Sequence, residues 1–277
     1  LTCGYVSEGR GWLEKTQSRG AGASASLRSR VLCGAGAFAE RLGEYERARS
    51  LLEESLAAFR VQGDQWAAGF ALHFLGHVAS AQGESGRAMS LYAESLALFR
   101  DAGDKWGCAL TLDCWGSGAL RQGDYDRAAS LHEESLALFR ELGNRRDQHG
   151  PLSGLGVVAE ARGDHARAAA LFEESLKMAR EIGHSGGVLT ATLRMGRLVF
   201  RQGDCERAAA LFKESLALRK AHGDRSGIAA CLTALAGVAV AEGRRDQAAR
   251  LFGAAEALRD AIHTAVPPAQ RAEYDRQ

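Results

Sequence analysis

One stretch decides the fold: residues 103–143, GDKWGCALTLDCWGSGALRQGDYDRAASLHEESLALFRELG. Asp104 follows a glycine, and its carboxylate can accept a backbone N–H from the first turn of a helix. Gly123 ends that helix in the left-handed conformation that glycine tolerates. Asp124 caps a second helix, which Gly143 ends in the same way. The stretch therefore predicts two helices joined by a Gly-Asp turn.

The same pattern recurs every 40 residues along the chain. Glycine returns at this step from Gly43 to Gly243, alanine does so from Ala48 to Ala248, and the tripeptide Glu-Ser-Leu occurs five times. Within each predicted helix the apolar residues follow the i, i+3, i+4 rule, so each helix has a face to bury. One helix pair cannot bury so much apolar surface alone. The sequence therefore predicts an all-α protein of stacked antiparallel helix hairpins.

The composition excludes several other classes. The 277 residues are 46% hydrophobic, and 35 basic side chains nearly balance 34 acidic ones, which argues against a nucleic-acid-binding domain. No run of about 18 apolar residues is present to span a membrane. The six cysteines lack CxxC spacing and indicate free thiols of a cytoplasmic protein. No phosphate-binding loop, nucleophile elbow or HExxH motif occurs, so we expect neither catalysis nor a cofactor.

The repeat resembles the tetratricopeptide repeat (TPR) family. A period of 40 in place of 34, and the absence of the closing proline, are features of long TPR repeats. The resemblance implies a right-handed α-solenoid, and counting the predicted helices gives six hairpins of 40-residue period over residues 25–263. Residues 1–24 are expected to hold a partial repeat and a linker, and residues 264–277 a Pro-Pro break and a further helix. In the second repeat the family pattern falls on Leu72, Leu75, Gly76, Ala79, Ala88, Tyr92 and Ser95.

The resemblance also implies a binding surface. In this family the first helix of each hairpin lines a concave groove, and its variable positions contact the ligand. These positions vary along the chain while the packing positions do not, which fits either a recognition surface or an absence of constraint. Arginines four residues apart at 197 and 201 can hold a carboxylate or phosphate. Transferred by register, the candidate groove residues are Arg30, Phe70, His73, His77, Asp113, Ser117, Arg121, Ser153, Glu160, Thr190, Arg197 and Arg201.

Other chemistry is open at a few of these positions. His73 and His77 lie four residues apart on one helix face, and Asp113 follows His73 by one period, a pattern that can hold a metal ion. The simpler interpretation is a polar face of the groove, with neutral, hydrogen-bonded histidines and no metal. Trp66 and Trp106 share one repeat position and fit either core packing or a binding platform.

The C-terminal sequence is similar to the end of the TPR array in large bacterial regulators. Residues 251–259, LFGAAEALR, are followed by Pro267-Pro268 and by RAEY at 271–274, as in LuxR-type and other STAND signal-transduction ATPases. The resemblance implies a fragment of a longer polypeptide that carries ATPase and DNA-binding modules elsewhere. This chain would be its sensor, binding a protein, a peptide or a small anionic inducer, without direct contact to nucleic acid or membrane. The alternative is a free-standing adaptor that joins two proteins.

Overall fold

The structure, a computed structural model, describes residues 24–261. Every regular element in that range is an α-helix, so the predicted all-α fold is confirmed. The half-repeat predicted before residue 24 and the Pro-Pro break predicted over 264–277 lie outside the described residues. The twelve helices are α2 (Ala25–Arg41), α3 (Tyr45–Gln62), α4 (Gln65–Ala81), α5 (Ser85–Asp101), α6 (Lys105–Gln122), α7 (Tyr125–Glu141), α8 (His149–Ala161), α9 (His165–Glu181), α10 (Ser185–Arg201), α11 (Cys205–His222), α12 (Arg225–Ala241) and α13 (Arg245–Ala261).

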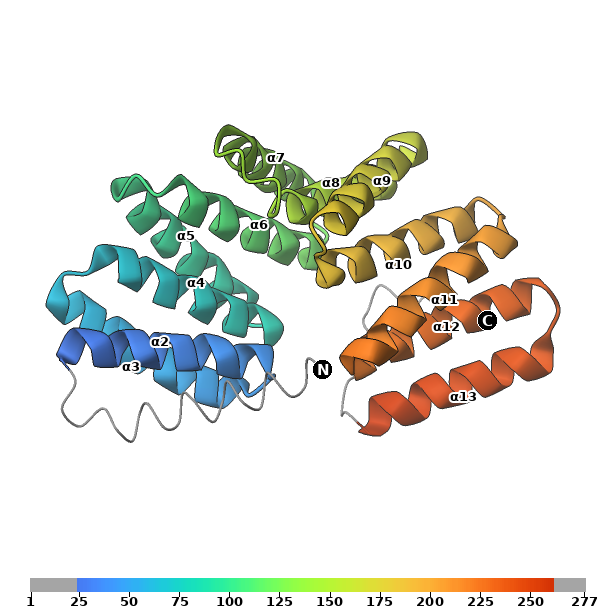
Figure 1. Cartoon of the computed structure of the whole chain (residues 1–277), viewed down its shortest axis with the longest axis horizontal. Coiled ribbons are helices and arrows are strands. Elements are labelled where there is room, and N and C mark those ends of the chain that lie inside the picture. The colour runs from blue at the N-terminus through green and yellow to red at the C-terminus, as the bar shows by residue number, and fades with distance from the viewer. Residues whose placement is uncertain (1–23, 262–277) are drawn as a thin grey trace. The chain divides into compact units, whose positions relative to one another are not determined.

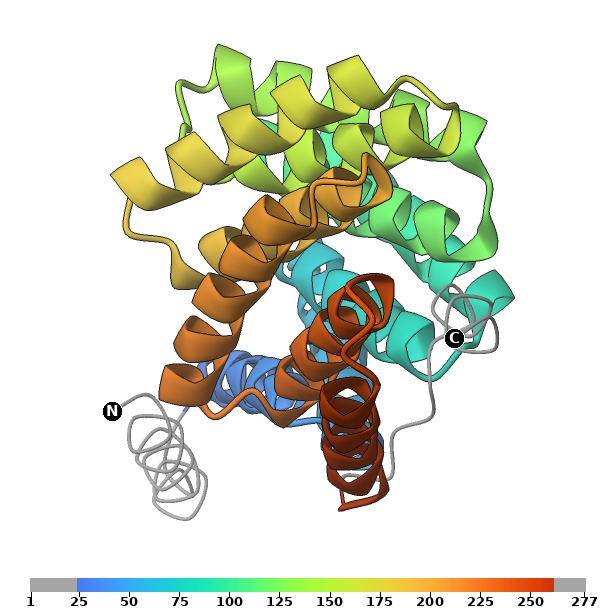
Figure 2. The ribbon, with the colours of Figure 1, turned by 90° about the vertical axis from the view of Figure 1, so that its right-hand side faces the viewer.

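The chain divides into two compact units, of which the first ends at Ala161 and the second begins at Arg162. In the first unit α2 packs on α3, α4 on α5 and α6 on α7, and each second helix packs on the first helix of the next pair (Figures 1 and 2). In the second unit the same order runs from α9 to α13. Because the unit boundary falls between α8 and α9, the division of residues 25–263 into six hairpins stays a prediction.

The two helices of a pair have different neighbours. We call the first helix of each pair the A helix (α2, α4, α6 and α8 in the first unit) and the second the B helix (α3, α5 and α7). Neighbouring A helices contact one another directly, α2 with α4, α4 with α6 and α6 with α8. Neighbouring B helices are bridged by long side chains, as between Arg100 and Glu134. Within the first unit the A helices therefore lie closer together and form the inner side of the stack.

The predicted turns are confirmed. Glycines at all eleven turns from Gly43 to Gly243 have positive φ, between 63° and 88°. At Gly103 the backbone has φ 67°, a conformation that other L-residues rarely adopt. Asp104 then accepts hydrogen bonds from the backbone N–H groups of Trp106 and Gly107 at 3.1 and 3.0 Å. Glycine thus ends one helix and the acidic side chain begins the next, as the sequence predicts.

One A helix begins later than its register predicts. The pairs before it place an A helix directly after the turn, but α8 starts only at His149. Pro151 has no backbone N–H, so it is tolerated in the first turn of a helix and not deeper inside. Asn144 and Asp147 fill the gap, with Asn144 Nδ2 donating to Asp147 Oδ2 at 2.8 Å. The proline therefore shortens this A helix at its N-terminal end.

In several repeats the recurring serine of Glu-Ser-Leu ties the two helices of a pair together, whereas Ser55 bonds to Leu52 of its own helix. Ser95 Oγ donates to the carbonyl oxygen of Gly69 at 2.8 Å, and Ser135 Oγ donates to that of Ala109 at 2.7 Å. Both serines are fully buried, and each bond joins a B helix to its own A helix 26 residues earlier. A small hydroxyl fits this close contact and satisfies its own hydrogen-bonding need there.

Replacing Ser95 with alanine is expected to lower the free energy of unfolding by about 1 kcal/mol, the usual net contribution of a buried hydrogen bond. Chemical denaturation measures this change. Ser90 lies on the same helix, exposed, with its hydroxyl bonded to Gly86 of its own helix. Ser90→Ala is therefore the matched control and should stay within about 0.5 kcal/mol of the unmodified chain. An equal loss in both variants would contradict a special role for Ser95.

Salt bridges connect successive B helices on the outer side. Arg100 Nη2 lies 2.7 Å from Glu134 Oε1, and the equivalent pair Arg60–Glu94 spans 2.5 Å. The outer side of the first unit thus carries a row of interhelical ion pairs. We expect a double-mutant cycle on Arg100 and Glu134 to give a coupling free energy of about 0.2–1 kcal/mol, because both side chains are half exposed. The coupling should shrink as the salt concentration rises to 1 M; coupling that is insensitive to salt would contradict an ion pair.

Candidate functional site

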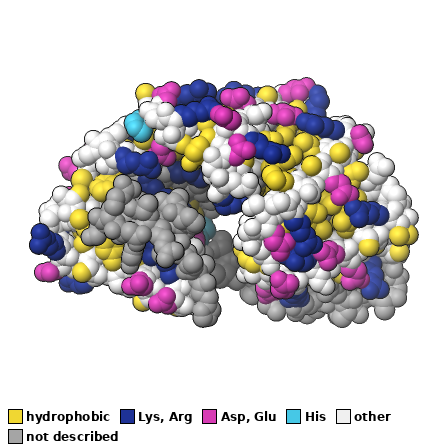
Figure 3. All heavy atoms as spheres, turned by 180° about the vertical axis from the view of Figure 1, so that it is seen from behind, with side chains coloured by type: hydrophobic (Ala, Val, Ile, Leu, Met, Phe, Trp, Pro, Cys, Tyr) yellow, Lys and Arg dark blue, Asp and Glu magenta, His cyan; other side chains and the backbone are white. Residues whose placement is uncertain are grey.

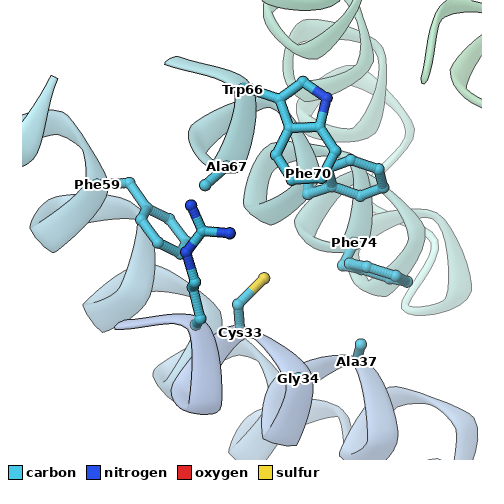
Figure 4. A pocket seen from close by; sticks show the side chains of 9 residues that line it. Cys33, Gly34, Ala37, Phe59, Trp66, Ala67, Phe70 and Phe74 are labelled. Atoms are coloured by element: carbon cyan, nitrogen blue, oxygen red, sulfur yellow. The ribbon is translucent and has the colours of Figure 1, made fainter. Parts of the chain in front are cut away.

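An apolar pocket lies on the inner side of the first unit, between α2 and α4 (Figure 4). Its volume is about 240 Å³. Helix α2 forms the floor, and α4 forms one wall with three aromatic side chains, while Phe59 reaches in from α3. The lining residues are Arg30, Cys33, Gly34, Ala37, Phe59, Trp66, Ala67, Phe70 and Phe74.

The aromatic wall continues from the pocket onto the next A helix. The rings of Trp66 and Phe70 pack edge to face with centroids 4.6 Å apart, and Phe70 lies 5.8 Å from Trp106 on α6. Phe70 also packs edge to face on the buried Phe99, which fixes it from below. Trp66 and Trp106 remain 43% and 37% exposed. We call Trp66, Phe70 and Trp106 the aromatic row. It packs on the core and is partly exposed, and a role of the tryptophans as a binding platform stays a prediction.

Acidic groups at the helix starts hold the aromatic row in place. The indole Nε1 of Trp66 donates to Asp104 Oδ2 at 2.7 Å, and that of Trp106 donates to Asp147 Oδ2 at 2.9 Å. At the pocket, Arg30 Nη2 lies 2.9 Å from Asp64 Oδ2. Each of these contacts runs from one A helix to the start of the next. These contacts therefore connect neighbouring A helices along the inner edge of the first unit and fix the orientation of both indole rings.

The structure separates the side chains that suggested a metal site. His73 is buried, and its Nδ1 lies 3.2 Å from Thr111 Oγ1, whereas His77 is exposed and its Nδ1 lies 2.6 Å from Glu40 Oε1. Burial, and secondarily the charge of His77, lower the pKa of His73 to about 3. Within residues 24–261 no group of three or more His, Cys, Asp or Glu side chains gathers to hold a metal ion. The metal hypothesis therefore loses its third ligand.

Asp113 instead lies beside a buried histidine. Its Oδ1 is 3.0 Å from His132 Nδ1, although the angles do not meet hydrogen-bond geometry. His132 is fully buried at the repeat position that Tyr92 occupies one period earlier. Asp113 of α6 thus faces α7, the other helix of its own pair, and the buried His132 has no access to a substrate. The pair is part of the packing.

The remaining predicted groove residues are spread over both units. In the first, Ser117 is half-buried, Arg121 Nη2 donates to Ser80 Oγ, and Ser153 is buried. Glu160 is half-buried. In the second unit all three predictions fall on α10, where Thr190 is exposed and bonded to the carbonyl of Gly186, Arg197 is half-buried and Arg201 is exposed. Their role as ligand contacts stays a prediction, and only Arg30 and Phe70 of the predicted set line the pocket.

The described cysteines are free thiols. Burial keeps Cys33 and Cys114 protonated. Desolvation by burial raises the pKa of Cys33 to about 11, and it raises the pKa of Cys114 further. A thiol with a raised pKa is a poor nucleophile, because the thiolate is the reactive species. In the pocket the sulfur of Cys33 therefore acts as apolar surface (Figure 4).

On the face shown in Figure 3, the described surface carries no large patch of one charge. Basic and acidic side chains are interspersed there, with apolar side chains between them. This agrees with the near balance of charge in the sequence. None of the described helices combines the length and the apolar character that a membrane span requires.

Sequence reasoning missed part of the pocket. Phe74, Gly34 and Ala37 line the pocket but are not among the predicted groove residues. The signal was present, because Trp66, Phe70 and Phe74 follow one another at four-residue steps on one helix face. Such a stripe is more often core, and only the neighbouring α2 shows that it borders an open pocket.

The paired helices, the glycine turns at 20-residue intervals and the inner row of A helices define a TPR solenoid. Comparison with known families specifies the class further. The chain belongs to the MalT-like TPR region family, whose model matches residues 106–273, more than half of its length. A tetratricopeptide repeat model matches residues 27–101. The resemblance drawn from the sequence is thereby confirmed.

Solved structures share this fold at low sequence identity. The apo form of RapI is 13% identical, with a TM-score of 0.72 over 91% of each chain. A Rap protein complexed with competence and sporulation factor is 14% identical, with a TM-score of 0.67 over 83% of this chain and 66% of that one. The STAND protein with a TPR sensor from Pyrococcus horikoshii is 17% identical, with a TM-score of 0.62 over 88% of this chain and 37% of that one. A search of the curated proteins finds no match by sequence.

Proposed function

We propose that this chain is a non-catalytic binding module that takes up a peptide segment of a partner protein on its inner A helices. The observation that carries the proposal is the apolar pocket between α2 and α4, continued by the exposed rings of Trp66 and Trp106. Exposed aromatic side chains held rigidly beside a cavity are typical of binding sites, because they offer large contact area at little entropic cost.

The chemistry of the first unit favours a peptide over a small anionic inducer. The pocket is lined almost entirely by apolar side chains, and its one cation, Arg30, is already paired with Asp64. A metabolite rich in charge would find only this one guanidinium, already engaged through Nη2, and would gain little from the apolar wall. An anionic ligand fits better at Arg197 and Arg201 of the second unit, which stay candidates for it.

We propose further that the module serves as the sensor of a larger bacterial regulatory protein in the cytoplasm. The fold shared with a STAND sensor, of which this chain matches only 37%, supports this context. In that setting a bound peptide would favour the states of the polypeptide that bind it more tightly, and so shift their populations. A free-standing adaptor would bind its partners without such a shift. Binding of a selected peptide to the complete polypeptide separates the two. A change in oligomeric state on binding supports the sensor, and binding without such a change supports the adaptor.

A selection from a library of random 12-residue peptides against the immobilised chain tests the binding proposal. The selection should enrich peptides that compete with one another for one site. Hydrogen exchange in the presence of an enriched peptide should show added protection on α2, α4 and α6. Enrichment of nothing, or protection confined to the B helices α3, α5 and α7, would reject the proposal.

A further inference from the structure

The pocket between α2 and α4 is large enough for one side chain and too small for a typical metabolite. Its volume of about 240 Å³ lies below the usual range of small-molecule sites, which is roughly 300–1,000 Å³. Its walls are the rings of Phe59, Phe70 and Phe74 and the neutral thiol of Cys33. Apart from the weak S–H donor of Cys33, these walls offer no hydrogen-bonding partner to a polar group. A large apolar side chain is the occupant that gains most from being buried there.

Arg30 is the one charged residue among those that line the pocket. The Arg30 side chain is 53% exposed, whereas that of its partner Asp64 is 24% exposed, so the accessible charge at this rim is positive. A guanidinium has five N–H donors, and the contact with Asp64 is made through Nη2. The remaining geometry suits a carboxylate, which can accept from two nitrogens of one guanidinium at once.

The surface does not end at the pocket. From Trp66 the aromatic row leads past Phe70 to Trp106 on the next A helix, within centroid distances of 4.6 and 5.8 Å. A ligand chain that places one side chain in the pocket can therefore continue along the row. This continuity favours an internal segment of a protein over a chain terminus.

We propose that the pocket between α2 and α4 binds a bulky apolar side chain of an internal peptide segment, and that Arg30 binds an Asp or Glu side chain within two positions of it. The proposal rests on the proposed function, because it specifies the partner of the same inner surface. The pocket supplies the anchor, Arg30 supplies the charge preference, and the aromatic row supports the segment beyond them.

Gly34 offers a way to fill the pocket without disturbing the fold. It lies on α2 between the lining residues Arg30 and Ala37, so a side chain at this position projects from the same helix face. A Cβ built on Gly34 meets no heavy atom within 4 Å. Leucine at this position also favours the helix. Gly34→Leu is therefore expected to fold and to occupy the anchor subsite.

The matched control is Gly253→Leu on α13. Gly253 also lies in mid-helix, is exposed and has no heavy atom within 4 Å of a built Cβ. The library of random 12-residue peptides is selected against the unmodified chain and against both variants, with the peptides amidated at the C-terminus. We expect a consensus of Leu, Met or Phe with Asp or Glu within two positions. A synthetic peptide of that consensus should bind Gly34→Leu at least about tenfold more weakly, from the loss of one buried apolar side chain. Gly253→Leu should leave its Kd unchanged.

Arg30→Gln tests the charge preference separately. The variant should retain the apolar preference of the consensus and lose the acidic one. For the synthetic peptide, Arg30→Gln and an Asp→Asn change in the peptide should each weaken binding by about three- to tenfold, and together by no more than either alone. Additive losses would show that Arg30 does not contact the acidic side chain.

The outcomes distinguish this proposal from the proposed function. Enriched peptides that bind Gly34→Leu with unchanged Kd would overturn the anchor and leave binding on the inner surface intact. Binding that requires a free C-terminal carboxylate would overturn the internal segment. If Gly34→Leu changes the sedimentation of the chain without peptide, the pocket binds a second copy of the chain instead. If no peptide is enriched, the proposed function and this proposal fall together.

Discussion

Replacing Gly76 with alanine is expected to lower the free energy of unfolding by about 1–3 kcal/mol, although alanine is the better helix former. Gly76 faces Tyr92 where α4 crosses α5, and an added Cβ would lie only 2.7 Å from Tyr92 Cε1. Tyr92 is fully buried, so its ring has no room to withdraw. The cost of separating the two helices should exceed the gain of about 1 kcal/mol in helix propensity.

The control for this prediction is the same substitution where space is open. Gly34 and Gly253 are exposed mid-helix positions with no heavy atom near a built Cβ. Alanine at either position should raise stability by about 0.5–1 kcal/mol, because glycine loses more backbone freedom on folding. Urea denaturation followed by circular dichroism measures all three variants. If Gly76→Ala also stabilises the chain, close helix approach is not the reason for glycine at this position.

The helices and turns were predictable because their causes are local. The positive φ of Gly103 and the cap formed by Asp104 depend on residues within one turn of each other, and both repeat with the period. The late start of α8 also has a local cause, because Pro151 is visible in the sequence and restricts where that helix can begin.

The candidate site was predictable only in part, because its contacts join residues almost one period apart. Trp66 bonds to Asp104 and Arg30 pairs with Asp64, at separations of 38 and 34 residues. The family register placed Arg30 and Phe70 on the inner side, where they line the pocket. The pocket itself depends on how far α2 stands from α4, and the glycine at position 34 leaves its floor open. Such distances are set by packing, and the sequence pattern does not contain them.

The two histidines of α4 show the same limit at the scale of one helix. A four-residue step turns a side chain by about 40° around the helix axis. That rotation is enough to place His73 under the neighbouring helix, against Thr111, while His77 stays exposed beside Glu40. Spacing alone put both on one polar face. Burial therefore gives His73 a chemistry that its spacing from His77 does not predict.

Lowering the pH from 7 to 5 is expected to remove about 2 kcal/mol of stability through His73 alone. The side chain is 3% exposed, and its burial, reinforced by the charge of His77, depresses its pKa to about 3 in the folded chain. An unfolded histidine titrates near 6.5. Below that pH the unfolded chain binds a proton that the folded chain refuses, so stability falls as the pH falls. The loss continues until the pH approaches 3, where the folded chain also takes up the proton.

His73→Gln isolates this contribution, because glutamine is neutral throughout and can still hydrogen-bond to Thr111 Oγ1. At pH 7 the variant should be less stable than the unmodified chain by about 1 kcal/mol, from imperfect packing in place of the ring. By pH 5 the order should reverse, since only the unmodified chain loses the histidine contribution. Urea denaturation of both chains at half-unit steps from pH 7 to 5 measures the difference in their free energies of unfolding. The contributions of all other titrating groups are common to both chains and cancel in that difference. Parallel stability curves would mean that position 73 accepts a proton in the folded chain, and hence that water reaches the inner side of α4 next to the aromatic row.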